Sequence, residues 1–365
     1  MEPVRRAVID VGTNSVKLLV ADVAGREVRP VSEQSKQTRL GHGFYETHRL
    51  RPEAIAATAS ALADFAAAAR AARAVSIRVF ATSAAREAVN REELTTAIER
   101  ASGLKVEIIS GDQEADWGFQ GVTTDPDLAQ TPLLLMDVGG GSAQFILGQD
   151  GRKLARHSFP LGSVRLLETI PCSDPPTPAE LAACRQWLKD FLRKEVRPKL
   201  LGMGETSDVG PRAVPARSAQ AEAKMLGQPE PAGGEGNGTA AGRAAREALG
   251  PGSGERLQLV GVGGAATILG CMESRLETFD RARIEATRLS AERVTWHLQR
   301  LWRLPLAERK QIIGLPSNRA DVILMGVAIY QAVMEEFGFQ ELRLSTRGLR
   351  FAALMPEAAQ PLAGS

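Results

Sequence analysis

Two short polar turns hold the residues of this chain with the clearest chemical potential. The segments Asp10–Ser15 (DVGTNS) and Asp137–Ser142 (DVGGGS) each follow an apolar stretch and precede an alternating one, and they begin 127 residues apart. Small residues in a tight turn let backbone N–H groups approach an anion and point at it. A carboxylate at the end of each preceding strand suits Mg²⁺ held largely through waters. Two such hairpins facing each other would hold a phosphoryl group and its metal from both sides.

Side chains within the two turns add donors to this predicted phosphate site. Thr13, Asn14, Ser15 and Ser142 supply hydroxyl and amide groups. A P-loop differs, because its glycines lead into a helix and a Lys follows the last glycine. Here a strand is predicted after each turn, and no Gly-Lys-Ser/Thr sequence occurs. One such turn is a common hairpin, whereas two in the same phase indicate an internal duplication.

Three further polar motifs are candidates for the same site, and each has a structural alternative. Glu114 follows Ser110-Gly111 in the first turn of a predicted helix, where it is either a stabiliser of the helix dipole or a general base that orients water. Arg86 follows a predicted strand and is either a bidentate phosphate contact or a surface ion pair. Gly263-Gly264 lead into a helix and form either a further anion-binding site or a packing turn. The Arg319-Ala-Asp321 segment is predicted to open a helix and could be a plain cap.

Apolar periodicity places these motifs in a chain of mixed strands and helices, which is typical of an α/β protein. The predicted strands are Val4–Asp10, Ser15–Val23, Glu27–Ser32, Val75–Thr82, Leu104–Ile109, Pro132–Asp137, Ser142–Gly148, Arg152–Phe159, Leu257–Val262 and Glu341–Ser345. The predicted helices are Glu53–Ala74, Arg91–Ala101, Asp112–Gly121, Thr177–Leu200, Gly263–Met272, Ala291–Leu301, Leu306–Ile313, Arg319–Phe337 and Gly348–Leu354.

Composition excludes several classes of protein. The 365 residues carry 45 Lys and Arg against 43 Asp and Glu, which argues against a protein built mainly to hold nucleic acid. The three cysteines form no CxxC pair, so neither a disulfide framework nor a zinc knuckle is indicated. Polar residues interrupt the N-terminal apolar stretch too early for a signal peptide, and no run approaches the length of a membrane helix. We therefore expect a soluble protein of the cytoplasm.

One segment differs in composition from the rest of the chain. Residues 204–256 contain 11 Gly, 5 Pro and no aromatic residue. Such a composition buries too little apolar surface to offset chain entropy. We predict a disordered insert on a surface loop, with a partner-binding tail as the alternative.

Taken together, the motifs resemble the exopolyphosphatase / guanosine pentaphosphate phosphohydrolase family of the actin-like superfamily. The resemblance covers nearly the whole chain outside the insert. It is carried by AVIDVGTNSVKLLVADV, RLGHG, FATSAAREAVN, IISGDQEA, LLLMDVGGGSAQFIL, FPLGSVRL, VGVGGAATIL, RADVILMGVAI and LSTRGLR. It implies an actin-like fold of the duplicated ribonuclease H-like type, with two subdomains and the active site in the cleft between them. The expected subdomains are 1–125, which the C-terminal segment 347–365 could complete, and 126–346, which contains the insert 204–256.

The resemblance also implies roles for individual residues. Glu114 matches the catalytic base of the family, and Asp10 and Asp137 match carboxylates associated with the metal, which is Mg²⁺ or alternatively Mn²⁺. Arg86 matches an arginine that contacts phosphate. The expected phosphate cradle consists of Thr13, Asn14, Ser15, Gly139, Gly140, Gly141 and Ser142.

This chain departs from the family pattern at several positions. Gln113 stands where a second acid is usual, and Asp116 replaces a common Arg, which we expect to weaken the binding of long polyanions. Ala265 replaces a usual Thr, and Phe351-Ala352 replace a usual Glu-Gly. A C-terminal helical HD-type domain of longer members is not expected here, so the chain resembles the short form.

The expected activity is the Mg²⁺-dependent release of terminal phosphate from inorganic polyphosphate by water that Glu114 activates. Hydrolysis of the 5′-phosphate of guanosine pentaphosphate is the alternative, because both reactions need the same chemistry. Two further hypotheses are a non-catalytic binder of polyphosphate or alarmone nucleotides, motivated by Gln113, Asp116 and Phe351, and a kinase of the same fold. We expect no nucleic-acid or membrane partner, and a homodimer only at the level of the family.

Overall fold

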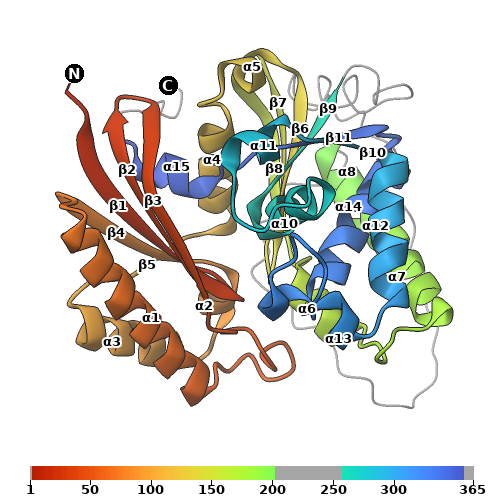
Figure 1. Ribbon diagram of the computed structural model, residues 1–365, viewed down its shortest axis with the longest axis horizontal. Coiled ribbons are helices and arrows are strands. Elements are labelled where there is room, and N and C mark those ends of the chain that lie inside the picture. Colours follow the sequence, from red (N-terminus) through yellow and green to blue (C-terminus); the bar gives the residue numbers. More distant parts are fainter. Residues whose placement is uncertain (1, 202–256, 357–365) are drawn as a thin grey trace, which may run out of the picture.

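The computed structural model describes residues 2–201 and 257–356 of the protein. The predicted insert 204–256 lies outside these residues, and so does the end of the C-terminal segment 347–365. Two β-sheets lie side by side, with helices between them and on their outer faces (Figure 1). None of the helices in the described ranges is long and apolar enough to cross a membrane.

The first sheet is built from the N-terminal strands in the order β3-β2-β1-β4-β5. Its strands are β1 (Val4–Val11), β2 (Ser15–Ala24), β3 (Glu27–Gln37), β4 (Ser76–Ala81) and β5 (Glu107–Ile108). The helices against it are α1 (Pro52–Ala71), α2 (Ser83–Glu87), α3 (Arg91–Ser102), α4 (Gly111–Val122) and α15 (Leu349–Leu354). Because side chains alternate between the faces of a strand, Ile9 packs with α1 and α3, whereas Val8 packs with α4 and α15.

The second sheet has six strands in the order β10-β11-β9-β6-β7-β8. Its strands are β6 (Leu133–Val138), β7 (Ala143–Gln149), β8 (Arg152–Phe159), β9 (Gln258–Val262), β10 (Arg288–Ser290) and β11 (Glu341–Leu344). The remaining helices are α5 (Pro126–Gln130), α6 (Ser163–Thr169), α7 (Pro178–Phe191), a π-helical turn (Leu192–Val196), α8 (Arg197–Leu200), α10 (Gly263–Glu273), α11 (Arg281–Ala286), α12 (Ala291–Arg303), α13 (Leu306–Arg309), a 3₁₀ turn (Ser317–Arg319) and α14 (Ile323–Phe337). The largest apolar core lies between this sheet and α7, α10, α12 and α14.

The two sheets repeat one strand arrangement, which confirms the predicted internal duplication and α/β class. In the first sheet β1, β2 and β3 form an antiparallel meander, and β4 joins β1 in parallel. In the second sheet β6, β7 and β8 form the same meander, and β9 joins β6 in parallel. Helix α4 lies between the sheets, since Trp117 packs on the first and Phe119 on the second. The division into subdomains 1–125 and 126–346 stays a prediction.

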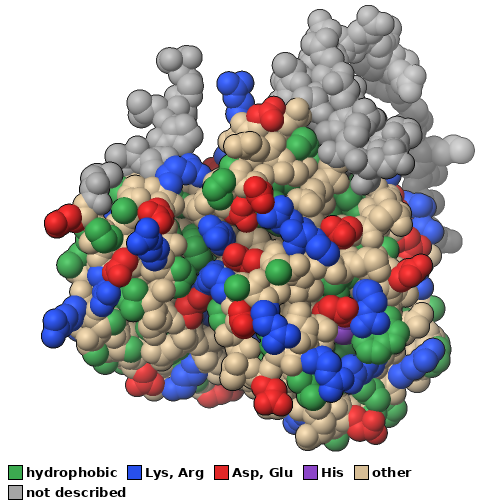
Figure 2. Space-filling model, turned by 45° about the horizontal axis from the view of Figure 1, so that its top comes forward, with side chains coloured by type: hydrophobic (Ala, Val, Ile, Leu, Met, Phe, Trp, Pro, Cys, Tyr) green, Lys and Arg blue, Asp and Glu red, His purple; other side chains and the backbone are tan. Residues whose placement is uncertain are grey.

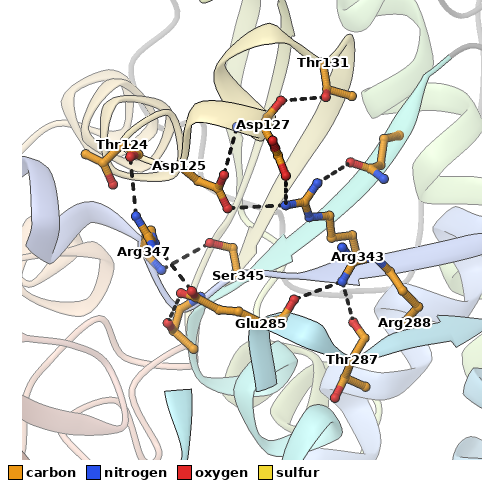
Figure 3. A network of polar contacts seen from close by, with 12 residues as sticks. Thr124, Asp125, Asp127, Thr131, Glu285, Thr287, Arg288, Arg343, Ser345 and Arg347 are labelled. Carbon is orange, nitrogen blue, oxygen red and sulfur yellow. Dashed lines mark hydrogen bonds and ion pairs between the residues drawn. The ribbon is translucent and has the colours of Figure 1, made fainter. Parts of the chain in front are cut away.

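A polar network fixes the place where the chain passes from one sheet to the other (Figure 3). Arg343 on β11 forms an ion pair with Asp125, which caps α5, at 3.3 Å. Arg347, just before α15, pairs with Glu285 of α11 at 3.5 Å and donates a hydrogen bond to the Thr124 carbonyl at 3.4 Å. The chain segment that follows α4 and the segment that precedes α15 are therefore joined by these polar contacts.

Several predicted helices and strands differ from the structure at their ends. The predicted helix Thr177–Leu200 is interrupted by the π-helical turn. The predicted helix Leu306–Ile313 ends at Arg309, and β5 contains two residues of the predicted strand Leu104–Ile109. The prediction that Arg319 opens a helix is wrong, because a 3₁₀ turn ends there and α14 begins at Ile323. Short helices such as α6 are absent from the prediction, since so short a helix shows too little periodicity.

Candidate active site

The two predicted hairpin turns lie together in a cleft of about 730 Å³, part of which is open to solvent. The turn between β1 and β2 packs on the turn between β6 and β7, because a Cβ built on Gly140 would lie only 2.9 Å from Thr13 Cβ. The cleft therefore brings together residues from two distant segments of the chain. The lining residues include Asp10, Thr13, Asn14, Ser15, Lys17, Glu114, Asp137, Gly139, Gly140, Gly141, Ser142, Gly264 and Arg319.

Hydrogen bonds from a neighbouring loop hold the carbonyl groups of the first turn. The N–H groups of Thr38 and Arg39 donate to the Asn14 carbonyl at 3.2 and 3.1 Å. The N–H group of Gly41 donates to the Thr13 carbonyl at 2.7 Å. Within the described residues the N–H groups of Thr13 and Asn14 have no partner. The RLGHG segment therefore engages the acceptors of this turn and leaves its donors free for an anion.

The second turn is held in the same way by the start of α6. Ser163 N–H donates to the Gly139 carbonyl at 3.0 Å, and the N–H groups of Val164 and Arg165 donate to the Gly140 carbonyl at 2.8 and 3.0 Å. The N–H groups of Gly140 and Gly141 bond to no other described residue. The start of α6, within the segment FPLGSVRL, thus donates hydrogen bonds to the carbonyls of the second turn, as RLGHG does for the first turn. Each segment comes after the third strand of its meander, β3 or β8. The duplication extends beyond the hairpins themselves.

Glu114 lies in the first turn of α4, where Ser110 caps the helix by accepting a hydrogen bond from Gln113 N–H. Only 8% of Glu114 is exposed, and its carboxylate pairs with Arg86 at 3.2 Å. Burial raises the pKa of Glu114 to about 7, with the charges of Asp137 and Asp10 raising it further and Arg86 opposing them. A buried carboxylate that titrates near neutrality can accept a proton from water.

Asp10 and Asp137 lie at the ends of the two strands that lead into the turns, and both line the cleft. Burial is the main cause that raises the pKa of Asp137 to about 6, and the neighbouring charge of Asp10 adds to it. The pKa of Asp10 is likewise raised by burial, and Lys17 opposes the shift. Two buried carboxylates that repel each other fit a site for a cation.

No cluster of three or more His, Cys, Asp or Glu side chains suited to a metal occurs among the described residues. A protein cage for the metal is therefore not present in that part of the chain. Mg²⁺ is usually bound by one or two carboxylates together with waters and substrate phosphates. Asp10 and Asp137 fit that mode of binding, in which the phosphates of the substrate complete the site.

Two cations of the cleft are not among the predicted site residues. Lys17 stands opposite Asp10 in the β1–β2 register, and burial lowers its pKa while Asp10 opposes that shift. Arg319 crosses from the second half of the chain and donates to Ser15 Oγ at 2.8 Å. A Cβ built on Gly264 would lie 3.9 Å from Lys17 Nζ and 3.8 Å from the Arg319 guanidinium, so both cations lie beside the start of α10.

Comparison with known proteins agrees with this geometry. A model of the Ppx/GppA phosphatase family matches residues 19–226 and 242–358 of the chain. The chain belongs to the Ppx/GppA phosphatase family. It is 30% identical to exopolyphosphatase 2 of Mycobacterium tuberculosis over 354 residues, which cover 93% of this chain and 94% of that protein.

Solved structures of Ppx/GppA proteins share the fold. A family member from Aquifex aeolicus is 25% identical, with a TM-score of 0.67 and 96% of each chain covered. An exopolyphosphatase from Cytophaga hutchinsonii is 22% identical, with a TM-score of 0.74 and 96% of each chain covered. The fold class expected from the sequence is thereby confirmed, whereas the bounds of the two subdomains stay a prediction.

Arg86, a residue of the expected site, and Asp116, a departure from the family pattern, both form ion pairs in the structure. Arg86 does not line the cleft; it pairs with Glu114 and donates to the Ile109 carbonyl at 2.9 Å. Asp116, expected to repel a polyanion, forms ion pairs with Lys153 and, at 3.1 Å, with Arg156 of β8. The negative charge of Asp116 is therefore compensated locally. A phosphate contact by Arg86 stays a prediction.

Proposed function

We propose that this chain is an exopolyphosphatase, which hydrolyses the terminal phosphoanhydride bond of inorganic polyphosphate. The observation that supports this most directly is the position of Glu114, a buried carboxylate with a pKa near 7 in the cleft of the two anion-binding turns. The similarity to exopolyphosphatase 2 of Mycobacterium tuberculosis over nearly the full length of both chains supports the same substrate. We expect the protein to work in the cytoplasm.

In this mechanism each group of the cleft has one task. The free N–H groups of the two turns bind the equatorial oxygens of the terminal phosphate and stabilise the charge that develops there. Glu114 accepts a proton from the attacking water, and Arg86 holds the Glu114 carboxylate in place. Asp10 and Asp137 would hold Mg²⁺, or alternatively Mn²⁺, which supplies charge neutralisation at the phosphates.

A second function uses the same cleft. Hydrolysis of the 5′-phosphate of guanosine pentaphosphate needs the same base and the same two turns. Both reactions hydrolyse a terminal phosphoanhydride bond, so the preference between the two substrates depends on what the rest of each substrate contacts. Binding without turnover is the third alternative.

Phosphate release separates these functions. Purified protein with Mg²⁺ is expected to release phosphate from polyphosphate more efficiently than from guanosine pentaphosphate or ATP. Chelation with EDTA should abolish the release, and added Mg²⁺ should restore it. Higher kcat/KM for guanosine pentaphosphate would favour the second function. Tight binding of polyphosphate without release of phosphate at any chain length would show that the protein binds polyphosphate but does not hydrolyse it.

The pH dependence of kcat/KM tests the role of Glu114. Its base form is the carboxylate, and its pKa is raised to about 7, so activity should fall as the pH drops below that value. Because Asp10 and Asp137 contribute to the raised pKa, a cation bound by them should move the acid limb to lower pH as Mg²⁺ is raised. A profile that is flat from about pH 5 to 8 would contradict this role.

A further inference from the structure

The start of α6 holds all three carbonyl groups of the glycine run in the second turn. Backbone N–H groups of α6 bind the carbonyls of Gly139 and Gly140. The third carbonyl is held by a side chain, because Arg165 Nε donates to the Gly141 carbonyl at 2.7 Å. Arg165 therefore completes the set of hydrogen bonds that fixes the backbone of this turn.

The hydrogen bond from Arg165 also sets the direction of a backbone donor. The peptide unit between Gly141 and Ser142 is trans and planar, so its carbonyl and its N–H group point in opposite directions. Ser142 lines the cleft, and its N–H group has no partner among the described residues. A guanidinium that holds the Gly141 carbonyl thus fixes the Ser142 N–H group in the opposite direction, as a free donor.

Glu87 at the end of α2 orients the guanidinium of Arg165. Its two carboxylate oxygens lie 2.6 and 2.7 Å from Arg165 Nη2. Only 15% of the Arg165 side chain and 23% of the Glu87 side chain are exposed, so solvent screens this ion pair little. The Ser83 hydroxyl donates to Glu87 at 2.9 Å and steadies the carboxylate. Arg165 therefore serves Gly141 and Glu87 at once, from two nitrogen atoms of one planar group.

The ring of Tyr45 supports the face of the same guanidinium. Arg165 Cζ lies 4.0 Å from the centre of that ring, which is a cation–π contact. A Cβ built on Gly141 would overlap with Tyr45 Oη and Ser83 Oγ. The second turn therefore packs directly on residues that belong to the first sheet's loop and helix. Arg165 lies at this contact, with a carboxylate at its edge and a ring on its face.

We propose that Arg165 and Glu87 are positioning residues for hydrolysis, in which Arg165 aligns the N–H donors of the second turn and Glu87 orients Arg165. The proposal rests on the proposed function, since such donors act where charge develops on the transferred phosphate. Glu87 belongs to a helix against the first sheet, whereas the second turn belongs to the second sheet. The donors of the second turn are thus aligned only while the two walls of the cleft are packed together.

The separate effects on kcat and KM test this role. Arg165→Gln keeps the backbone N–H bond to Gly140 and should lower kcat on polyphosphate by about 10- to 100-fold, because small displacements of groups that stabilise a transition state are costly. KM should stay within about twofold, since these donors act mainly in the transition state. Arg165→Lys should not restore kcat, because an ammonium group cannot serve both acceptors in this geometry. A raised KM with unchanged kcat would mean that the ion pair only holds the walls together, which overturns the proposal.

A double variant shows whether Glu87 acts through Arg165. Glu87→Gln keeps an oxygen acceptor but loses the charge, so kcat should fall by up to about tenfold. Added to Arg165→Gln, it should cause no further loss, because two residues that act on one group are not additive. Losses that multiply in the double variant would show that Glu87 acts separately and would contradict the proposal.

Arg5→Gln is the matched control. Arg5 likewise joins a carboxylate to a backbone carbonyl, since it pairs with Asp22 at 2.8 Å and donates to the Ala72 carbonyl at 3.3 Å. It lies near the start of β1, whereas the first turn follows the end of that strand. Charges of both signs are interspersed on the face of the protein in Figure 2, so the loss of one arginine should change the general field little. We expect unchanged kcat, and an equal loss of kcat in the Arg5 and Arg165 variants would overturn the proposal.

Melting temperatures above the assay temperature confirm that the variants are folded. If Arg165→Gln does not fold, kcat and KM of Glu87→Gln decide, because that variant keeps a neutral partner for Arg165.

The outcomes also separate this proposal from the proposed function. Wild-type protein that releases no phosphate from any polyphosphate would refute the function itself. Phosphate release by the wild type at a kcat that Arg165→Gln leaves unchanged would refute the positioning role alone. If guanosine pentaphosphate is the better substrate, the same loss of kcat is expected with it, since the donors contact the phosphate that is transferred.

Discussion

Glu114→Gln is expected to lower kcat on polyphosphate by roughly 10²–10⁴-fold, the range in which general base catalysis usually contributes. Gln has nearly the same size as Glu and can still accept the hydrogen bond from Arg86, but it cannot accept a proton from water. KM should change little, because the anion-binding N–H groups belong to the two turns. Steady-state phosphate release over a range of polyphosphate concentrations provides both constants.

Asp112→Asn is the matched control for this variant. Asp112 lies in the same first turn of α4, and its side chain is 64% exposed and pairs with Arg156 at 3.4 Å. Its removal takes one carboxylate from the same helix N-terminus without touching the cleft. If Glu114 only stabilised the helix dipole, the two variants would lose similar stability and Glu114→Gln would remain active. That result would contradict the catalytic role.

Stability provides an independent readout of the same substitution. The pKa of Glu114 is about 7 in the folded protein, above its ordinary value of 4.5, so the folded state binds the proton more tightly. The free energy of unfolding therefore falls as the pH rises from about 4.5 to 7, and Glu114 costs stability above that range. Glu114→Gln should match the wild-type melting temperature near about pH 4 and exceed it near about pH 8. A loss of stability at the higher pH would contradict this electrostatic account.

The parts of the site that lie within one motif are predictable from the sequence. Asp10 and Asp137 lie at the ends of predicted strands, and the tight turns after them reverse the chain into the next strand. The expectation that the two turns face each other follows from their repeated pattern, and the contact of Thr13 with Gly140 agrees with it. Local chemistry and periodicity thus indicate both the hairpins and their common ligand.

The contributions that depend on tertiary packing cannot be predicted in this way. Arg319 has the pattern of a plain cap, and it reaches Ser15, 304 positions away, only because of how α14 begins beside the cleft. Lys17 follows the alternation of an ordinary strand, and the start of α10 lies beside it in the folded protein. The neutralisation of Asp116 depends on β8, which lies far from it in the sequence. In each case the residue type is visible in the sequence, but the partner is not.

The role of the RLGHG segment, residues 39–43, could not be predicted from the sequence either. The sequence presents this segment as part of a family resemblance, with no chemistry of its own. In the structure its N–H groups bind the carbonyls of the first turn, and its Gly43 lies against the Arg51 guanidinium. Backbone hydrogen bonds of this kind have no side-chain signature, so they become evident only in the folded structure. The same holds for the start of α6 and the second turn.

Lys17→Met is expected to lower kcat/KM on polyphosphate by about 10- to 100-fold, as the loss of a buried charged contact to phosphate predicts. Lys17 lines the cleft beside the two turns, and no ion pair or hydrogen bond of its Nζ occurs within the described residues. Burial lowers the pKa of Lys17 in spite of the attraction of Asp10 and Asp137. Burial therefore disfavours the charged form of Lys17, and an anion bound in the cleft would stabilise it.

The sign of the stability change decides between these roles of Lys17. A folded pKa below the ordinary value means that the folded state holds the proton less tightly, so removal of the charge should leave the melting temperature near about pH 8 equal or higher. Lys36→Met is the control, since Lys36 lies on the neighbouring strand β3, is 50% exposed and pairs with Asp64 at 3.0 Å. It should change neither activity nor stability appreciably. If Lys17→Met unfolds the protein and polyphosphate does not stabilise the wild type, Lys17 is a structural counter-ion of the two aspartates. If the variant is stable, inactive and no longer stabilised by polyphosphate, the cleft holds this cation for its substrate.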